Sequence, residues 1–278
     1  MLRFCLRKSL KPGVPGQRHG PARGFYSNGR KRTVAAYIDG LLDGPFIAYK
    51  RGGAKKAVGA YRAGKVHGAW TRWFRNSLDR GRYVEGEKHG KWVTELYDGG
   101  RLEGGYDAGR KHGVWLTFAK GNAKTGEEFY ENGRPDRTWR GWYADGKLRF
   151  EGTWVNGRKN GTWRSWHSNR KLESTVAYVD GRRHGEQLQF YGNGKQRARG
   201  HYAKGRRTGI WVFFYDDGSK RSEGSYADDR KIGTWHEVDR KGAPIRTVDW
   251  DALRAKMAQG REVDLARPAT PHTIQRQP

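Results

Sequence analysis

Basic residues, mostly in pairs, recur at one place in this sequence, shortly after a glycine. Guanidinium and ammonium groups bind phosphate and carboxylate groups through charge-assisted hydrogen bonds. A fold that stacks these residues would give a cationic edge suited to a polyanion. The residues predicted to bind an anionic partner are Lys65, Lys88, Arg110, Lys111, Arg158, Lys159, Arg182, Arg183, Arg206, Arg207, Arg230 and Lys231.

Histidines occupy a neighbouring position, and four of them directly precede another glycine: His67, His89, His112 and His184. A zinc ion needs its nitrogen ligands about 2 Å away. Equivalent turns of stacked hairpins lie roughly 10 Å apart, so these histidines are not expected to share a metal ion. Asn160 and Thr208 at the same position indicate that a polar residue suffices there.

The sequence carries no arrangement typical of an enzyme. Its Gly-x-x-x-Gly segments lack the Lys-Ser/Thr of a phosphate-binding loop. Glu127 and Glu128 are adjacent and would face opposite sides of a strand. The single cysteine, Cys5, excludes an internal disulfide framework and a cysteine-based zinc site. We therefore predict a non-catalytic protein without a cofactor, and no apolar run is long enough to span a bilayer.

An aromatic residue followed three positions later by glycine repeats with a period of about 24 residues. The repeat is G-x-Y-x-x-G-x-x-x-G-x-W, most clearly over residues 59–70. The first aromatic residues are Tyr37, Tyr61, Tyr83, Tyr106, Tyr130, Trp154, Tyr178, Tyr202 and Tyr226. The second ones are Trp70, Trp92, Trp115, Trp139, Trp163, Trp211 and Trp235, with Phe46 and Gln187 in the same position.

This period predicts an all-β fold, an elongated open sheet or solenoid of about nine stacked β-hairpins. Each tyrosine lies on a short strand, a segment such as GRKHG turns the chain, and the tryptophan opens the return strand. The glycine two residues before each tyrosine leaves room for a ring from a neighbouring strand. A single hairpin cannot bury its rings, so the units must stack.

These residues resemble the MORN repeat family, in the variant form with tryptophan after the second glycine that is found in YwqK-type proteins. The resemblance covers about residues 37–240, although Asp136, Arg137 and Asp229 replace expected glycines and Gln187 replaces an aromatic residue. It implies an elongated sheet of hairpins and non-catalytic roles in scaffolding, dimerisation, protein contact and phospholipid contact.

Three segments follow from composition. Residues 1–28 are a basic leader, and the first 38 residues hold nine Lys or Arg and no acid. The opening ten residues suggest a short amphipathic helix, and the segment is typical of a mitochondrial transit peptide. Residues 29–249 form the repeat array. Residues 250–278 hold a capping helix over Trp250–Gly260 and an irregular tail.

The formal net charge of +27 makes an anionic partner the favoured interpretation. RNA, anionic lipid head groups and acidic protein surfaces all qualify. The leading hypothesis is a peripheral structural subunit of a large mitochondrial assembly, with ribosomal RNA of the mitochondrial ribosome as the partner. A respiratory or ATP-synthase complex is an alternative, as is a soluble antitoxin-like adaptor that binds protein through its Trp/Tyr face. The expected location is the mitochondrial matrix or the matrix side of a membrane.

Overall fold

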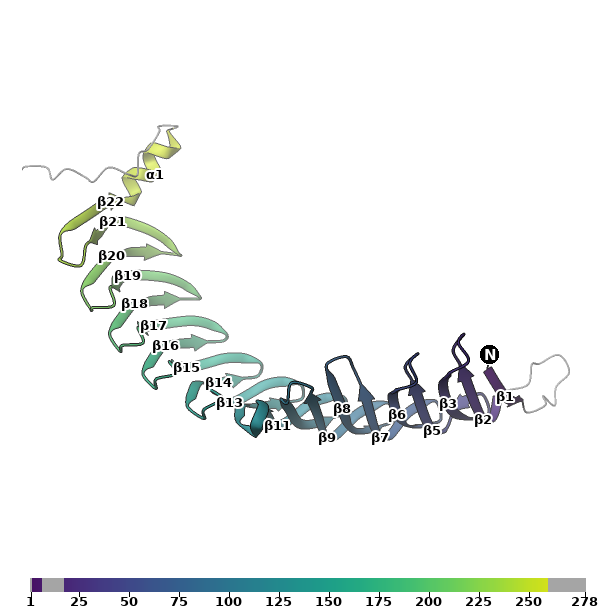
Figure 1. Cartoon of the computed structure of the whole chain (residues 1–278). Coiled ribbons are helices and arrows are strands. Elements are labelled where there is room, and N and C mark those ends of the chain that lie inside the picture. The colour runs from purple at the N-terminus through teal and green to yellow at the C-terminus, as the bar shows by residue number, and fades with distance from the viewer. Residues whose placement is uncertain (1, 7–17, 260–278) are drawn as a thin grey trace, which may run out of the picture. The chain divides into compact units, whose positions relative to one another are not determined.

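The structure is a computed structural model that describes residues 2–6 and 18–259 (Figure 1). These residues divide into two compact units, which are treated separately. Unit 1 runs to Arg137 and includes Ala144–Gly146, and unit 2 takes Thr138–Tyr143 and the chain from Lys147. The remainder of the predicted leader (residues 1 and 7–17) and the predicted tail (260–278) lie outside the described residues.

Both units consist of antiparallel strands that pair with their neighbours in sequence. The strands of unit 1 are β1 (Leu2–Leu6), β2 (Arg18–Phe25), β3 (Lys31–Ile38), β4 (Leu41–Leu42), β5 (Gly44–Tyr49), β6 (Lys55–Arg62), β7 (Lys65–Trp73), β8 (Ser77–Val84), β9 (Glu87–Leu96), β10 (Arg101–Asp107), β11 (Arg110–Phe118) and β12 (Lys124–Glu131). A 3-10 turn, Lys120–Asn122, precedes β12, and β13 (Arg134–Trp142) is divided between the units. The all-β prediction is confirmed.

Unit 2 continues the same pattern and ends in a helix. Its elements are β14 (Leu148–Val155), β15 (Arg158–Trp166), β16 (Leu172–Val179), β17 (Arg182–Phe190), β18 (Gln196–Ala203), β19 (Arg206–Phe214), β20 (Lys220–Ala227), β21 (Arg230–Val238), β22 (Pro244–Asp249) and α1 (Trp250–Ala258). Asp249 caps α1, since its Oδ1 accepts hydrogen bonds from the backbone N–H groups of Asp251 and Ala252 at 3.0 Å. Leu253 is buried and α1 packs on β21, as the short C-terminal helix was predicted to do.

Nine two-residue turns close the hairpins in the described part of the chain. Both central residues have positive φ, for example Lys204 at 51° and Gly205 at 92°, as a type I′ turn requires. The return strand therefore begins at the basic pair, several residues before the tryptophan. The prediction that segments such as GRKHG form the turn was wrong. Their second glycine, such as Gly209 with φ 63°, lies instead at a β-bulge within the return strand.

Six of the repeats are held together by a tryptophan that lies flat on a glycine of the preceding strand. A Cβ atom at Gly200 would lie 2.2 Å from the indole of Trp211, and the other glycine–tryptophan pairs are equally close. The indole N–H of Trp211 donates to the carbonyl of His201 at 3.2 Å. The same pairs occur at Gly59/Trp70, Gly81/Trp92, Gly104/Trp115, Gly152/Trp163 and Gly224/Trp235. The predicted space for a ring is confirmed.

The tyrosines connect successive repeats through edge-on ring contacts. The ring of Trp211 lies 5.3 Å from Tyr202 of its own repeat and 6.0 Å from Tyr226 of the next, with interplanar angles of 87° and 82°. Such edge-to-face pairs are favourable because the ring edge is positive and the ring face negative. The core of each unit is therefore a file of rings on one face of the sheet, in which indole and phenol rings mostly alternate.

The leader departs from its prediction within the described residues. Leu2–Leu6 form β1 and pair with β2, where a helix was expected. Their large apolar residues, Leu2, Phe4 and Leu6, recur with a period of two, which is the pattern of a strand. β2 pairs in turn with β3, and the phenol of Tyr26 donates to the carbonyl of Tyr49 at 2.6 Å. The sheet thus begins before residue 29.

Replacing Gly200 by alanine is expected to destabilise unit 2 by about 2–3 kcal/mol, because the new methyl group overlaps the buried indole of Trp211. Gly192 is the matched control, since a Cβ there meets only the Nδ2 atom of Asn169 at 4.0 Å. Gly192→Ala should change the free energy of unfolding by less than about 0.5 kcal/mol. Urea denaturation followed by circular dichroism measures both, and equal effects would contradict this account of the glycine.

Candidate anion-binding surface

The two residues of each basic pair lie on opposite faces of the sheet, because successive residues of a strand alternate. In β19 the guanidinium of Arg207 lies 4.1 Å from the ring centroid of Tyr226 and donates to its phenol oxygen at 2.8 Å. The side chain of Arg206, by contrast, is 64% exposed. The single cationic edge predicted from the sequence is therefore two rows with different surroundings.

The inner row belongs to the aromatic core. The ammonium groups of Lys88, Lys111, Lys159 and Lys231 lie between 3.8 and 4.2 Å from the ring centroid of the tryptophan four residues later. Burial lowers the pKa of Lys88, Lys111 and Lys231. Arg183 and Arg207 take the same position over Tyr202 and Tyr226. These six predicted binding residues contact rings of their own fold.

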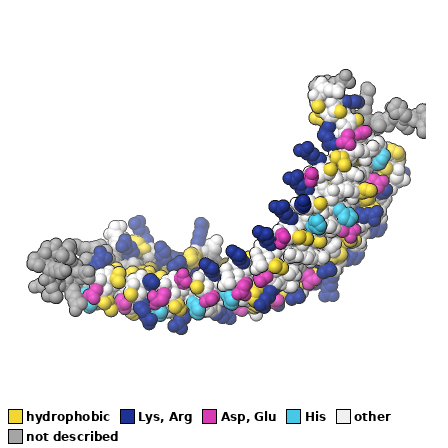
Figure 2. All heavy atoms as spheres, turned by 180° about the vertical axis from the view of Figure 1, so that it is seen from behind, with side chains coloured by type: hydrophobic (Ala, Val, Ile, Leu, Met, Phe, Trp, Pro, Cys, Tyr) yellow, Lys and Arg dark blue, Asp and Glu magenta, His cyan; other side chains and the backbone are white. Residues whose placement is uncertain are grey.

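The outer row of unit 2 faces solvent. We call it the arginine row, and it consists of Arg158, Arg182, Arg206 and Arg230. Figure 2 shows Lys and Arg side chains standing out at successive repeats. The residues directly opposite on the partner strands are Val155, Val179, Ala203 and Ala227. None of these four partners is charged, so the sheet itself does not neutralise the row.

Only one close ion pair to the arginine row is found in the described residues. The Oδ1 atom of Asp228 lies 3.8 Å from a guanidinium nitrogen of Arg206, and both side chains are well exposed. Exposed ion pairs of this kind are worth about 0–1 kcal/mol. The row therefore remains available to an external anion.

Unit 1 has no equivalent row. Lys65 and Arg110 occupy the outer position, but Glu87 lies between them in sequence, and Asp107 stands directly opposite Arg110. Lys65 also lies 3.8 Å from Glu85. Arg134 occupies the outer position of β13 and was missed in the sequence, although it follows Arg110 by the repeat period of 24 residues. Arg134 is followed by Pro135 and not by a second basic residue, so this repeat lacks the basic pair that marked the others.

The histidines of unit 1 pair with carboxylates of the next repeat. The Nδ1 atoms of His67, His89 and His112 lie 3.4–3.7 Å from Glu85, Asp107 and Glu131, respectively. His19 makes the same contact with Asp39 at 3.4 Å. No group of three or more potential metal ligands occurs in residues 2–6 and 18–259. These pairs use the carboxylates of unit 1 to link neighbouring hairpins.

Three segments match the model of the MORN repeat variant, residues 138–156, 183–204 and 207–228. These three segments are MORN repeats of the variant type. No curated protein matches the sequence. Among solved structures, the TcdB2–TccC3 complex is similar over 81% of this chain at 10% identity and a TM-score of 0.18. The chain spans only 18% of the length of that complex's chain.

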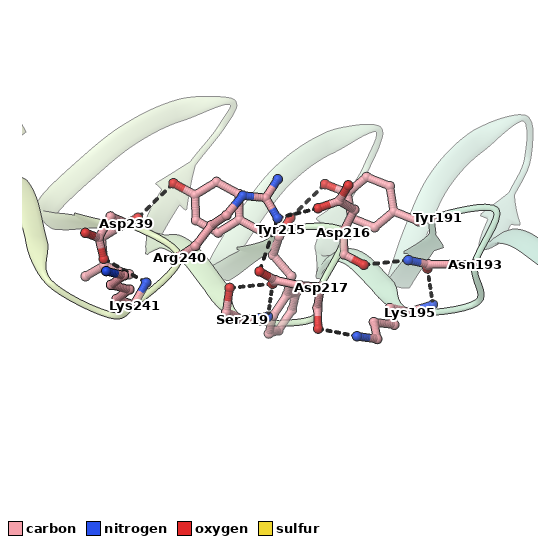
Figure 3. Close-up of polar contacts among 12 residues, drawn as sticks. Tyr191, Asn193, Lys195, Tyr215, Asp216, Asp217, Ser219, Asp239, Arg240 and Lys241 are labelled. Atoms are coloured by element: carbon pink, nitrogen blue, oxygen red, sulfur yellow. Dashed lines mark hydrogen bonds and ion pairs between the residues drawn. The ribbon is translucent and has the colours of Figure 1, made fainter.

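The opposite rim of the MORN repeats in unit 2 is formed by the longer loops, and its polar side chains are used internally (Figure 3). The phenol of Tyr191 donates to the carbonyl of Phe214, and Tyr215 donates likewise to Val238, at 2.8 and 2.9 Å. Lys195 donates to the carbonyl of Asp217 at 2.5 Å. The long-loop rim thus fastens each repeat to the next.

Carboxylates on the long-loop rim are held ionised. Two hydrogen bonds from Ser219, with the guanidinium of Arg240 nearby, lower the pKa of Asp217 to about 2. Hydrogen bonding to Arg240 likewise lowers the pKa of Asp216. This rim therefore mixes anionic and cationic groups, whereas at the tight turns of unit 2 the four exposed arginines outnumber the exposed carboxylates of Asp180, Asp228 and Asp229. The arginine row is the better candidate for binding an anion.

Stability is expected to fall as the pH rises above 10, through the buried phenols. Burial raises the pKa of Tyr226 above the ordinary value of 10.0, so the unfolded chain releases this proton first. The stabilising contribution of the neutral phenol is complete below pH 10 and is lost as the pH approaches the folded-state pKa. Thermal melting from pH 9 to 12 should show a weaker decline in Tyr226→Phe than in the wild type. Identical declines would refute this assignment.

Proposed function

We propose that this protein is a non-catalytic scaffold that binds a polyanionic partner, with RNA favoured, along the arginine row of unit 2. One observation carries the proposal: four exposed arginines at the same hairpin position face uncharged residues across the sheet, with a single weak ion pair among them. Each guanidinium can donate two parallel hydrogen bonds to a phosphate, which a lysine cannot do.

The proposed mode of binding is contact with the phosphate backbone. Two strands per repeat place the arginines roughly 10 Å apart, a regular series that follows a chain of phosphates without reading its bases. Base stacking on the repeat rings is not part of the proposal, because tryptophans such as Trp211 are 3–9% exposed. The same burial leaves little tryptophan surface for a protein adaptor that would use the Trp/Tyr face.

The proposed setting is a large ribonucleoprotein assembly in which the protein is a peripheral structural subunit. Only the basic, acid-poor composition of the segment before Asp39 favours a mitochondrial location, since its strands β1, β2 and β3 pair into the sheet; the mitochondrial ribosome is the leading assembly. No helix in the described residues is both long and apolar enough to cross a membrane. Binding to a respiratory or ATP-synthase complex would have to use the same arginine row on acidic protein or lipid head groups.

The test is the salt dependence of RNA binding by the full chain. Fluorescence anisotropy with a mixed-sequence single-stranded RNA of about 30 nucleotides should show binding at 50 mM salt that weakens steeply towards 300 mM. Four phosphate contacts correspond to a slope of about −3 in a plot of log affinity against log salt. RNAs of scrambled sequence should bind equally. No binding at 50 mM salt, or a slope near zero, would reject RNA as the partner.

A further inference from the structure

A cleft of about 630 Å³ lies at the C-terminal end of the arginine row, where α1 follows the last strand. A cleft of this size is within the range of small-ligand sites. Its lining residues are Arg206, Ala227, Asp228, Arg230, Ile232 and Arg254. Three of the six are arginines and one is a carboxylate, so the lining carries a net positive charge.

The three guanidiniums come from three separate elements, β19, β21 and α1. Arg206 and Arg230 belong to the arginine row, and Arg254 adds a third group from the helix. The side chain of Arg230 makes no hydrogen bond or ion pair with any of the described residues. The earlier members of the row, Arg158 and Arg182, do not line this cleft. The cleft is therefore the place where the arginine row is joined by a third guanidinium, that of Arg254.

Arg254 is held in position before any ligand binds. One of its terminal nitrogens donates to the carbonyl of Lys231 at 2.7 Å, and the other donates to Asp251. The second carboxylate oxygen of Asp251 accepts the backbone N–H of Gly233 at 2.8 Å. This N–H group and the guanidinium of Arg254 lower the pKa of Asp251, so the carboxylate that holds Arg254 stays ionised. A fixed guanidinium loses little freedom on binding.

We propose that this cleft binds the terminal phosphate monoester of a polynucleotide whose chain continues along the arginine row. The inference rests on the proposed function. A phosphate monoester carries about −1.5 to −2 charges and three acceptor oxygens near neutral pH, which suits three guanidiniums better than an internal phosphodiester with one charge does. Ile232 and Ala227 supply apolar surface for the terminal sugar and base.

The experiment compares three RNAs of one sequence that carry a 5′-phosphate, a 3′-phosphate or hydroxyl groups at both ends. Binding is measured by anisotropy with the full chain at 150 mM salt. One phosphorylated form should bind about tenfold more tightly than the hydroxyl form, the size expected of one charge-assisted contact network. The form that gains affinity identifies which end of the RNA the cleft receives.

Variants separate the cleft from the row. Arg230→Gln and Arg254→Gln should each abolish the preference for the phosphorylated end. The side chain of Arg230 has no partner in the described fold, so Arg230→Gln tests the cleft even if Arg254→Gln loosens α1. Arg158→Gln is the matched control, because it removes one arginine of the row outside the cleft. It should weaken all three RNAs equally and keep the tenfold ratio.

Equal affinity of the wild type for all three RNAs would overturn the inference and leave the proposed function standing. Failure of every RNA to bind at low salt would overturn both. A phosphoserine peptide bound through Arg230 and Arg254, with no effect of RNA phosphorylation, would also overturn the inference, since the cleft would then receive a modified protein.

Discussion

Replacing Trp211 by alanine is expected to lower the free energy of unfolding of unit 2 by about 3–5 kcal/mol. The indole is 3% exposed and fills the space over Gly200, with Tyr202, Phe213 and Tyr226 around it. Alanine would remove these contacts and leave a cavity between two repeats. Because each repeat is stabilised by its neighbours, the loss should also weaken the hairpins on both sides.

Ile210→Ala is the control for Trp211→Ala. Ile210 precedes the tryptophan on β19, but its side chain points away and is 65% exposed, so its truncation should cost less than about 0.5 kcal/mol. Urea unfolding followed by far-UV circular dichroism avoids the fluorescence that the substitution removes. Similar midpoints for the two variants would show that the ring file does not hold the repeats together.

Three repeats depart from this pairing, because Ala35, Glu128 and Val176 stand where the glycine is expected before Phe46, Trp139 and Gln187, respectively. Gln187 stands where tryptophan is expected, and the residue that would be its glycine is Val176, directly across the strand pair. The side chain of Gln187 is buried, and its Oε1 atom has no hydrogen-bond partner within the described residues. A valine is tolerated there because no indole needs the space, and Trp139, which has Glu128 in place of the glycine, is only half-buried.

The period and the space-making glycines were predictable because each depends on residues close in sequence. The direction of the basic pairs was not predicted correctly. The spacing placed the basic pairs, such as Arg206 and Arg207, at the same turn position of successive repeats. The length of the turn decides on which face of the sheet each residue of a pair lies. Two residues with positive φ, Lys204 and Gly205, close the hairpin, so both arginines already belong to the strand and alternate.

The contacts between repeats could not be predicted from the sequence either. His89 and Asp107 are 18 residues apart, and their pairing follows from the stagger of successive hairpins. The cleft at the end of the row depends on where α1 lies against β21, since that position brings Arg254 near Arg230. A helix could be predicted from Trp250–Gly260, but the face that it offers could not.

Reversing two charges of the arginine row should have the largest effect on binding. Arg182→Glu combined with Arg206→Glu removes two phosphate contacts and adds two repulsive charges, so RNA affinity at 100 mM salt should fall by about 100- to 1000-fold, equivalent to roughly 3–4 kcal/mol. The sheet should remain folded, because both side chains are exposed and face Val179 and Ala203. Anisotropy and thermal melting measure the two effects separately.

Net charge alone would also weaken binding, so the control must change it equally. Arg170→Glu with Lys241→Glu makes the same change in unit 2 on the long-loop rim, where both side chains are exposed. This control should lose less than about tenfold, because charges beyond a Debye length of about 10 Å are largely screened at this salt concentration. If both double variants bind alike, the position of the arginines is irrelevant and RNA is attracted only by overall charge. If neither loses affinity, the partner is held by another surface, and a protein contact replaces the phosphate contact proposed for the row.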